Sequence, residues 1–439
     1  MRNKLFSFFG VFLIFVLLLS ACSNKSSSGE GGSENSDAIV LGMWGDADEI
    51  KSEKELIKKF NEEYPDIKVE VVYKSWDSYW EWLTSQASSK DLPDIFKMDP
   101  MYFQRYADLG ALKNLDSLIE SSEFDTSNFE QNVLEITQKD GEQLALPRDA
   151  NVITMAYNKD LFDNAGVDYP EEEMSWDEVL QLAQKLTLDK DGNNALSSSF
   201  DPDSISQYGI AVDSAGAADG VLEPQLWSNN ARLLDDDGKL ALDGPKEMEV
   251  LNFFKDLKSK YHVEPSTGEM EKISDDSFLI LGSKRVAMSF IGSWNINTLE
   301  DADINFDIMM PPKFENGEVK TVVQPASYAM SPYTKKEEDT WKLLSWLAGP
   351  EGQKEIAKKG QSLPANKQAF DDYLPDIDDF NKQIFFDLQS KSIDDPYGVE
   401  DKSKLWEEYI VQKLQPALDD KKDLSQAIEE IAELWDAKR

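Results

Sequence analysis

The chain has 439 residues, with 84 acidic residues against 45 basic ones, one histidine and one cysteine. Its net charge of −39 argues against nucleic acid as a partner, because phosphate binding needs clustered Lys and Arg. An acidic polysaccharide is also disfavoured, unless a local basic pocket overrides the net charge. A zinc site built from histidines is excluded, and Ser-His or Cys-His nucleophilic catalysis is nearly excluded.

The N-terminal residues predict export. Arg2 and Lys4 precede an uncharged apolar run over residues 5–20, which is short for a membrane helix of ~20 apolar residues and is typical of a secretory signal. The sequence Leu19-Ser20-Ala21-Cys22 then resembles the bacterial lipobox. That resemblance implies a diacylglyceryl group on the Cys22 thiol and cleavage before it, with residues 1–21 as the signal peptide. The alternative is an uncleaved anchor.

Residues 22–37 are rich in Ser and Gly and predict a flexible tether, because such a chain cannot bury enough apolar surface to fold. With the single thiol lipidated, the folded part has no cysteine left for a disulfide, a metal site or a nucleophile. The chain from residue 38 onward is too long for one ordinary hydrophobic core, so two domains are expected.

The predicted elements of the first part alternate between strands and helices. In chain order they are a strand at 38–44, a helix at 46–64, a strand at 67–73, a helix that starts at "SWDSYW" and a strand at 93–99. This order predicts a parallel sheet with helices on its faces. Ligands of such sheets bind at the carboxyl ends of the strands, where Trp44, Trp76 and Asp99 fall.

The later elements are less regular. Ser175 and Glu178 form a capping box that predicts a helix start. The others, in chain order, are a helix end, a strand and a glycine-hinged loop with Trp294 at 279–296, a strand at "TVVQPASYAMS", two helices broken at Gly349-Pro350, and a continuous helix at 403–439.

Seven stretches together indicate a family. They are "SWDSYW", "LPDIFKMDP", "YADLGALKNL", "LPRDANVITMAYNKDLFDNAGV", "SWDEVLQLAQKL", "RVAMSFIGSW" and "WKLLSWLAGPEGQKEIAKKGQSLPAN". In this order they resemble the extracellular solute-binding proteins of family 1, the maltose-binding-protein-like carbohydrate receptors of ABC importers. The resemblance extends from residue 38 to the C-terminus, and the lipobox is similar to that of tethered Gram-positive members.

The resemblance implies an α/β fold of the periplasmic-binding-protein type, with two lobes and a ligand cleft between them. It places the crossings between the lobes near Pro147, Val319 and Gly352. The implied division is 38–147 for the first part of the N-lobe, 148–318 for the first part of the C-lobe, 319–352 for the second part of the N-lobe and 353–439 for the second part of the C-lobe.

Sugar chemistry and the resemblance together suggest the binding residues. Aromatic rings stack on the apolar faces of a sugar, and carboxylates, amides and Arg bond its hydroxyls. The resemblance implies that Trp294 stacks on the ligand and that Asp46 and Asp99 contact it. The full set of candidates is Trp44, Asp46, Trp76, Asp99, Arg148, Asp149, Asn151, Trp227, Trp294 and Tyr328.

One departure from the family leaves the identity of the sugar open. A tyrosine pair common in oligosaccharide-binding relatives has no clear counterpart in this chain. The stretch "EPQLW", which carries Trp227, is the candidate replacement.

We therefore expect a receptor that captures a mono- or oligosaccharide by lobe closure and delivers it to the permease subunits of an ABC importer. It is expected on the outer face of the cytoplasmic membrane, lipid-anchored, on a Gram-positive cell surface. No cofactor or metal site is predicted. The alternative is a secreted glycoside hydrolase with paired carboxylates, although 84 acidic residues would supply such pairs in any fold. The sequence leaves open the sugar, its length, the permease and a bound metal ion or peptide.

Overall fold

The computed structural model describes residues 37–45, 47–216, 218–315, 317–360, 362–373, 380–392 and 404–437. Ala38–Arg439 forms one compact unit. The predicted signal peptide, Cys22 and most of the predicted tether therefore lie outside the described residues. Among the helices that are described, none is both long and apolar enough to cross a lipid bilayer.

Within the described ranges, a five-stranded sheet has the order β2-β1-β3-β13-β6. β1 pairs in parallel with β2 and with β3, which confirms the predicted parallel arrangement of the first three strands. β13 pairs antiparallel with β3 and β6, so a late segment of the chain completes the early sheet. The strands are β1 (Ile39–Trp44), β2 (Val69–Lys74), β3 (Ile95–Met98), β6 (Ala145–Pro147) and β13 (Ser327–Met330).

Helices pack around this first sheet. The start of α3 (Pro100–Asp108) has a clear local cause, because the Asp99 carboxylate accepts a hydrogen bond from Met101 N at 2.9 Å and Pro100 occupies the first helical position. This cap fixes Asp99 at the carboxyl end of β3. The other helices are α1 (Ala47–Glu63), α2 (Trp76–Ser89), α4 (Asp116–Ser122), α5 (Gln131–Glu135), α12 (Glu337–Ala348) and α13 (Pro350–Lys359).

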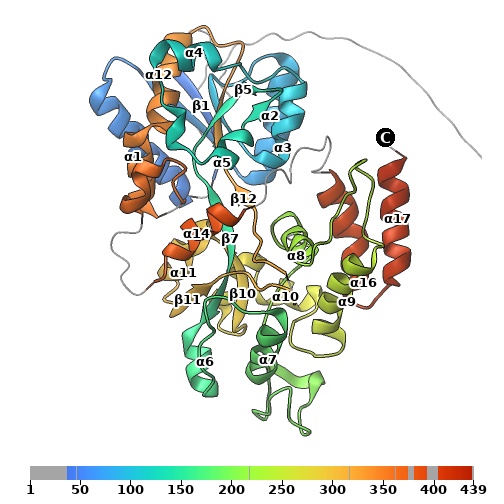
Figure 1. The fold of residues 1–439 in the computed structure, drawn as a ribbon. Coiled ribbons are helices and arrows are strands. Elements are labelled where there is room, and N and C mark those ends of the chain that lie inside the picture. Colours follow the sequence, from blue (N-terminus) through green and yellow to red (C-terminus); the bar gives the residue numbers. More distant parts are fainter. Residues whose placement is uncertain are drawn as a thin grey trace, which may run out of the picture. The chain divides into compact units, whose positions relative to one another are not determined.

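The second sheet is built around β7 (Asn151–Asn158), which is buried over its whole length. In the described part of the chain, β10 (Met288–Gly292), β11 (Phe306–Met309) and β12 (Val323–Gln324) all pair antiparallel with β7. Apart from α12 and α13, which pack beside the first sheet, the described helices that follow β7 along the chain are α6 (Lys159–Ala165), α7 (Trp176–Leu186), α8 (Glu223–Ser228), α9 (Pro245–Ser259), α10 (Thr267–Ile273), α11 (Ile296–Asp301), α14 (Gln383–Lys391), α16 (Gln415–Leu418) and α17 (Leu424–Asp436) (Figure 1).

Short strands form two hairpins outside the main sheets. They are β4 (Gln138–Lys139) with β5 (Glu142–Gln143), and β8 (Leu188–Asp189) with β9 (Ile205–Gln207).

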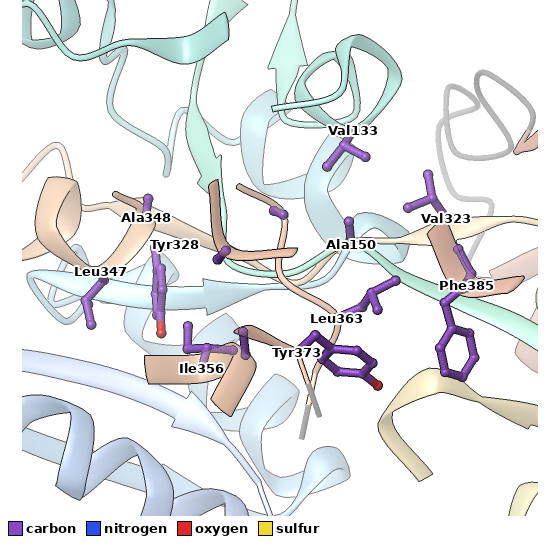
Figure 2. Close-up of a cluster of buried hydrophobic side chains, with 14 of the residues drawn as sticks. Val133, Ala150, Val323, Tyr328, Leu347, Ala348, Ile356, Leu363, Tyr373 and Phe385 are labelled. Atoms are coloured by element: carbon purple, nitrogen blue, oxygen red, sulfur yellow. The ribbon is translucent and has the colours of Figure 1, made fainter. Parts of the chain in front are cut away.

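The described chain passes between the two main sheets at residues 148–150, at residues 325–326 and after α13. These passages share one apolar core. Figure 2 shows Ala150, Val323 and Leu363, which come from or adjoin the three passages, in a single buried cluster. The amide of Ala150 also donates a hydrogen bond to the carbonyl of Leu363 at 2.9 Å. The passages are therefore held together by both packing and backbone hydrogen bonds.

Two of the passages lie later in the chain than the residues predicted for them. Val319 precedes β12, which still pairs with the second sheet at Val323–Gln324. Gly352 lies within α13, which packs against α1 beside the first sheet. A Cβ atom at Gly352 would meet the carbonyl oxygens of Trp346 and Leu347 at 2.5 and 2.7 Å, so this glycine permits the close approach of α13 to α12.

The C-terminal segment corrects another prediction. Residues 403–439 were expected to form a continuous helix, but the described part consists of a π-helical segment (Leu405–Leu414), α16 and α17, with a break at residues 419–423. Asp420 has a positive φ of 58° in this break. The carboxylate of Asp423 then accepts a hydrogen bond from Gln426 N at 2.9 Å and starts α17.

The capping box predicted for α7 is confirmed and supports a stability prediction. Ser175 Oγ accepts from Glu178 N at 3.3 Å, and Glu178 Oε2 accepts from Ser175 N at 2.8 Å. We expect Ser175→Ala to lower the free energy of unfolding by about 1 kcal/mol in urea titration, because the amide of Glu178 in the first turn loses its acceptor. Ser121→Ala, on exposed α4, is the control and should change it by about 0.5 kcal/mol or less. Equal losses in both variants would show that the cap does not stabilise α7.

Candidate ligand-binding site

A cavity of about 770 Å³ opens between the two main sheets. Its size falls in the range of roughly 300–1,000 Å³ that is typical of small-molecule sites. The lining comes from the ends of β1 and β3, from α1 and the end of α13, from the passages between the sheets and from the segments on either side of β10. The site therefore lies where the carboxyl ends of the first parallel strands face the second sheet, as the order of the elements predicts.

An aromatic cluster forms the wall on the side of the first sheet. Trp44 ends β1 and Trp76 begins α2, and their rings meet edge to face with centroids 5.1 Å apart. Trp76 is 37% exposed, so part of its ring faces the cavity. Behind them, Trp80 stacks on Tyr102 at 3.9 Å. This packing holds the two cavity-facing rings in fixed positions.

A second aromatic pair, Phe278 and Trp294, lines the cavity from the other sheet, with ring centroids 5.8 Å apart. Gly292 ends β10 and explains the position of Trp294. A Cβ atom at residue 292 would lie 2.4 Å from the Trp294 ring, so only glycine lets the ring fold back over the backbone. The Gly292 amide donates to Asn295 Oδ1 at 2.9 Å and fixes the turn.

Lys97 is a buried cation in the lining of the cavity. It lies on β3, is 2% exposed, and its Nζ is 4.1 Å from the ring centroid of Trp44. The Nζ also donates to the carbonyl oxygen of Trp44 at 3.4 Å. Burial lowers the pKa of Lys97, because the charged form loses its hydration. The cation is held instead by the face of the indole and by the backbone.

A buried polar network borders the cavity, and two of its members, Asp149 and Ser362, belong to the cavity lining. Arg148 Nη1 donates to Asp149 Oδ2 at 2.8 Å and to Ser362 Oγ at 3.0 Å, while Nη2 donates to Glu53 Oε2 at 3.3 Å. The hydroxyl of Tyr328 donates to Glu53 Oε1 at 2.8 Å and accepts from Arg148 Nε at 3.2 Å. The network thus joins α1 and β13 to the first and third passages.

The buried carboxylate of Asp149 contacts both Arg148 and the second passage. Burial raises the pKa of Asp149, and the neighbouring Arg148 opposes that shift. Asp149 Oδ1 also accepts a hydrogen bond from Ala326 N at 2.7 Å, in the second passage. Asp149 therefore ties the first two passages together at the floor of the cavity.

Asn151 joins the loop after β10 to the third passage, also beside the cavity. Its Oδ1 accepts from Ser293 Oγ at 2.9 Å and from Leu363 N at 3.0 Å. It stands at the start of β7 and is 6% exposed, so its position is set by the loop after β10 and by the third passage. The side chain lines the cavity from this fixed position.

The structure brings together most of the predicted site residues but not all of them. Arg148, Trp227 and Tyr328 do not line the cavity, and Asp46 lies outside the described residues. Those that line it are Trp44, Trp76, Asp99, Asp149, Asn151 and Trp294.

Each of the three predicted residues that do not line the cavity has a physical reason for its position. Tyr328 is 0% exposed, because β13 is buried over its whole length and the hydroxyl is bonded within the network. Arg148 is occupied by Asp149, Glu53 and Ser362. Trp227 lies on α8 and packs against the core of the second sheet. The geometry favours positioning roles for Arg148 and Tyr328 over direct ligand contact.

Sequence reasoning missed two cavity residues. Lys97 had a usable signal, because a lysine in the middle of an otherwise apolar buried strand is unusual. Phe278 had none, since it follows a polar stretch and lies in a short 3₁₀ helix, Ser277–Ser283, with no distinctive spacing.

A sequence model of the family described as "Bacterial extracellular solute-binding protein" matches residues 55–382 of the chain. Among individual proteins, the chain is 26% identical over 428 residues to the galactooligosaccharide-binding protein of Bacillus subtilis, which covers 95% of this chain and 93% of that protein. It is 23% identical over 275 residues to the arabinooligosaccharide-binding protein of the same organism, which covers 61% of this chain and 57% of that protein.

Solved structures share the fold. An ABC substrate-binding protein from Listeria monocytogenes, in complex with cycloalternan, matches with a TM-score of 0.79 and 22% identity, and covers 90% of this chain and 97% of that one. A solute-binding protein from Thermotoga lettingae, bound with α-D-tagatose, matches with a TM-score of 0.75 and 23% identity, over 91% of this chain and 98% of that one. These matches show that the chain has the two-lobed α/β fold expected from its sequence.

Proposed function

Since the chain belongs to the bacterial extracellular solute-binding proteins, we propose that it is a carbohydrate receptor of an ABC importer. It holds a mono- or oligosaccharide in the cavity between the two sheets and delivers it to the permease. The observation that carries this proposal is the pairing of aromatic rings on opposite walls of one cavity, Trp44 and Trp76 on the first and Phe278 and Trp294 on the second.

The chemistry of the lining suits a sugar. Indole and phenyl faces stack on the CH faces of a pyranose, while carboxylates and amides accept or donate hydrogen bonds at its hydroxyls. Asp99, Asn151 and Gln324 supply such groups between the two aromatic walls. The oligosaccharides named for the two Bacillus subtilis relatives support the same ligand class.

The passages between the sheets provide the motion that a receptor needs. We place the boundaries between the lobes at residues 148–150, at residues 325–326 and after Lys359, where the chain leaves one sheet for the other. Ligand favours the closed arrangement because it contacts both walls only when they approach each other. The closed form then presents surfaces of both lobes to the permease subunits.

The receptor is favoured over the glycoside hydrolase, because the family and the relatives named above are binding proteins. Isothermal titration of the purified chain with a panel of uncharged mono- and oligosaccharides should show saturable binding for at least one of them. Chromatography of the sugar afterwards should recover it intact. Steady release of shorter sugars, or no heat with any sugar from a folded sample, would overturn the proposed function.

The lipid anchor is part of the same proposal. A diacylglyceryl group on Cys22 would hold the receptor at the outer face of the cytoplasmic membrane, and residues 22–37 would let it reach the permease. We expect Cys22→Ser to be shed into the medium or to keep its signal peptide, as judged by fractionation and the mass of the chain. Ser23→Ala is the matched control and should stay with the membrane. Lipid-modified, membrane-held Cys22→Ser protein would rule out this anchor.

A further inference from the structure

The charges that line the cavity are unevenly distributed. Among the described lining residues, six are acidic and three are lysines. They are Glu49, Glu55, Asp99, Asp149, Asp276 and Asp301 against Lys51, Lys97 and Lys359. A local basic pocket could have overridden the net charge of the chain, but this lining shares its negative sign.

Two of the lysines have their charge already engaged. Lys359 forms an ion pair with Glu55 of α1. Lys97 rests on the face of Trp44 and donates to the Trp44 carbonyl, and nearby Glu49 and Asp149 stabilise its charged form. Neither lysine therefore provides an uncompensated positive charge for an acidic ligand.

The third lysine, Lys51, is exposed on α1, on the side of the first sheet. The wall on the side of the second sheet therefore has the more negative net charge. Asp276 and Asp301 stand on either side of the aromatic pair Phe278 and Trp294 in the chain, and both residues are exposed. Partial burial of its carboxyl group raises the pKa of Asp276, and the hydrogen bond that it accepts from Phe278 N opposes this shift. Among the described residues of this wall, from 276 to 301, no lysine or arginine lines the cavity. A ligand that stacks on Trp294 therefore lies in a field set by carboxylates.

We propose that this cavity is charge-selective: it admits uncharged or positively charged saccharides, excludes those that carry carboxylate or phosphate groups, and owes this selectivity chiefly to Asp276 and Asp301. Repulsion between like charges that face each other across a binding interface disfavours binding, and it therefore discriminates strongly against a ligand of the same charge. The proposal rests on the proposed function for the identity of the ligand as a saccharide. The field itself exists whether or not a saccharide binds.

The field can be measured without a ligand, through quenching of tryptophan fluorescence by caesium and by iodide at constant ionic strength. The contribution of Trp294 is the difference between the protein and its Trp294→Phe variant. For each ion, the quenching constant of this contribution is divided by the quenching constant of free N-acetyltryptophanamide. We expect this ratio to be larger for caesium than for iodide. In the double variant Asp276→Asn/Asp301→Asn, that preference should fall by at least about twofold.

The controls separate the cavity from the acidic surface as a whole. Asn replaces Asp276 as a helix cap at little cost, so the fold should be retained. Glu429→Gln/Glu433→Gln removes the same charge from the exposed face of α17 and should leave the caesium preference unchanged. Equal quenching by iodide and caesium, or an equal loss in the α17 variant, would overturn the proposal. Absence of sugar binding would overturn the proposed function instead and would not alter this readout.

A competition experiment extends the test to ligands of matched size. The protein is incubated with an equimolar mixture of galactobiose and digalacturonate and examined by native mass spectrometry. The expected result is retention of galactobiose in excess of digalacturonate. Retention of digalacturonate in excess of galactobiose would overturn the charge selectivity while it supported a saccharide receptor.

Discussion

Arg148→Ala is expected to lower the free energy of unfolding by about 3–5 kcal/mol, the largest loss among the variants considered for this chain. The guanidinium is 4% exposed and is bonded to Asp149, Glu53 and Ser362. Its removal leaves two carboxylates buried without their cation, and each would have to ionise in a dry site or take up a proton. Urea unfolding followed by circular dichroism measures the loss.

Two further variants separate the network from the loss of one positive charge. Arg148→Lys keeps the charge but cannot bond Asp149, Glu53 and Ser362 together, so an intermediate loss is expected. Arg232→Ala breaks an ion pair with Asp236 whose side chains are 63% and 93% exposed, and should cost about 0.5 kcal/mol or less. If Arg148→Ala and Arg232→Ala unfold at the same urea concentration as the unchanged protein, the network does not hold the passages together.

Trp294→Ala is expected to weaken sugar binding by about 30-fold or more, which corresponds to about 2 kcal/mol of binding free energy. The ring is half-buried beside Phe278 and presents its remaining surface to the cavity. Truncation removes a stacking face and leaves the ligand with water on that side. The measurement is the dissociation constant for whichever sugar of the panel binds, obtained by isothermal titration.

Trp227→Ala is the matched control, because it removes the same side chain from a position outside the cavity. It should lower stability through lost packing on the core of the second sheet, with the dissociation constant changed by about twofold or less. Trp76→Ala, on the opposite wall, should weaken binding as Trp294→Ala does. Unchanged affinity in Trp294→Ala together with lost affinity in Trp227→Ala would place the ligand elsewhere.

The early sheet could be predicted because its signals are local. The apolar runs that became β1, β2 and β3 alternate with helix patterns, and this order determines a parallel sheet by general rules of connection. The capping box of Ser175 and Glu178 is a two-residue signal with its own geometry. The passages carry no such signal. The third follows a regular helix, α13, whose pattern does not show which sheet it packs on.

Residues of the candidate site could be predicted from the sequence when the direction of the chain alone determines where they lie. Trp44 ends β1 and Asp99 follows β3, so any parallel pairing brings both residues to the same edge. Tyr328 could not be placed in this way. All residues of β13 are buried, so the alternation of apolar and polar residues that would show the direction of its side chain is absent.

Trp227 shows how one residue can mislead. It lies in a helix, α8, whose first turn contains Pro224, a position where proline is well tolerated. The helix turns Trp227 toward the core of the second sheet. The stretch "EPQLW" therefore does not place an aromatic ring in the cavity lining to replace the tyrosine pair that this chain lacks.

The central claim is that a saccharide binds between the two aromatic walls of one cavity. A crystal structure of the protein with the sugar that binds most tightly tests it most directly. The expected result is a sugar ring stacked on Trp294, with its hydroxyls bonded to cavity groups such as Asp99 and Asn151. Density for the sugar outside this cavity, with the cavity occupied only by water, would contradict the claim.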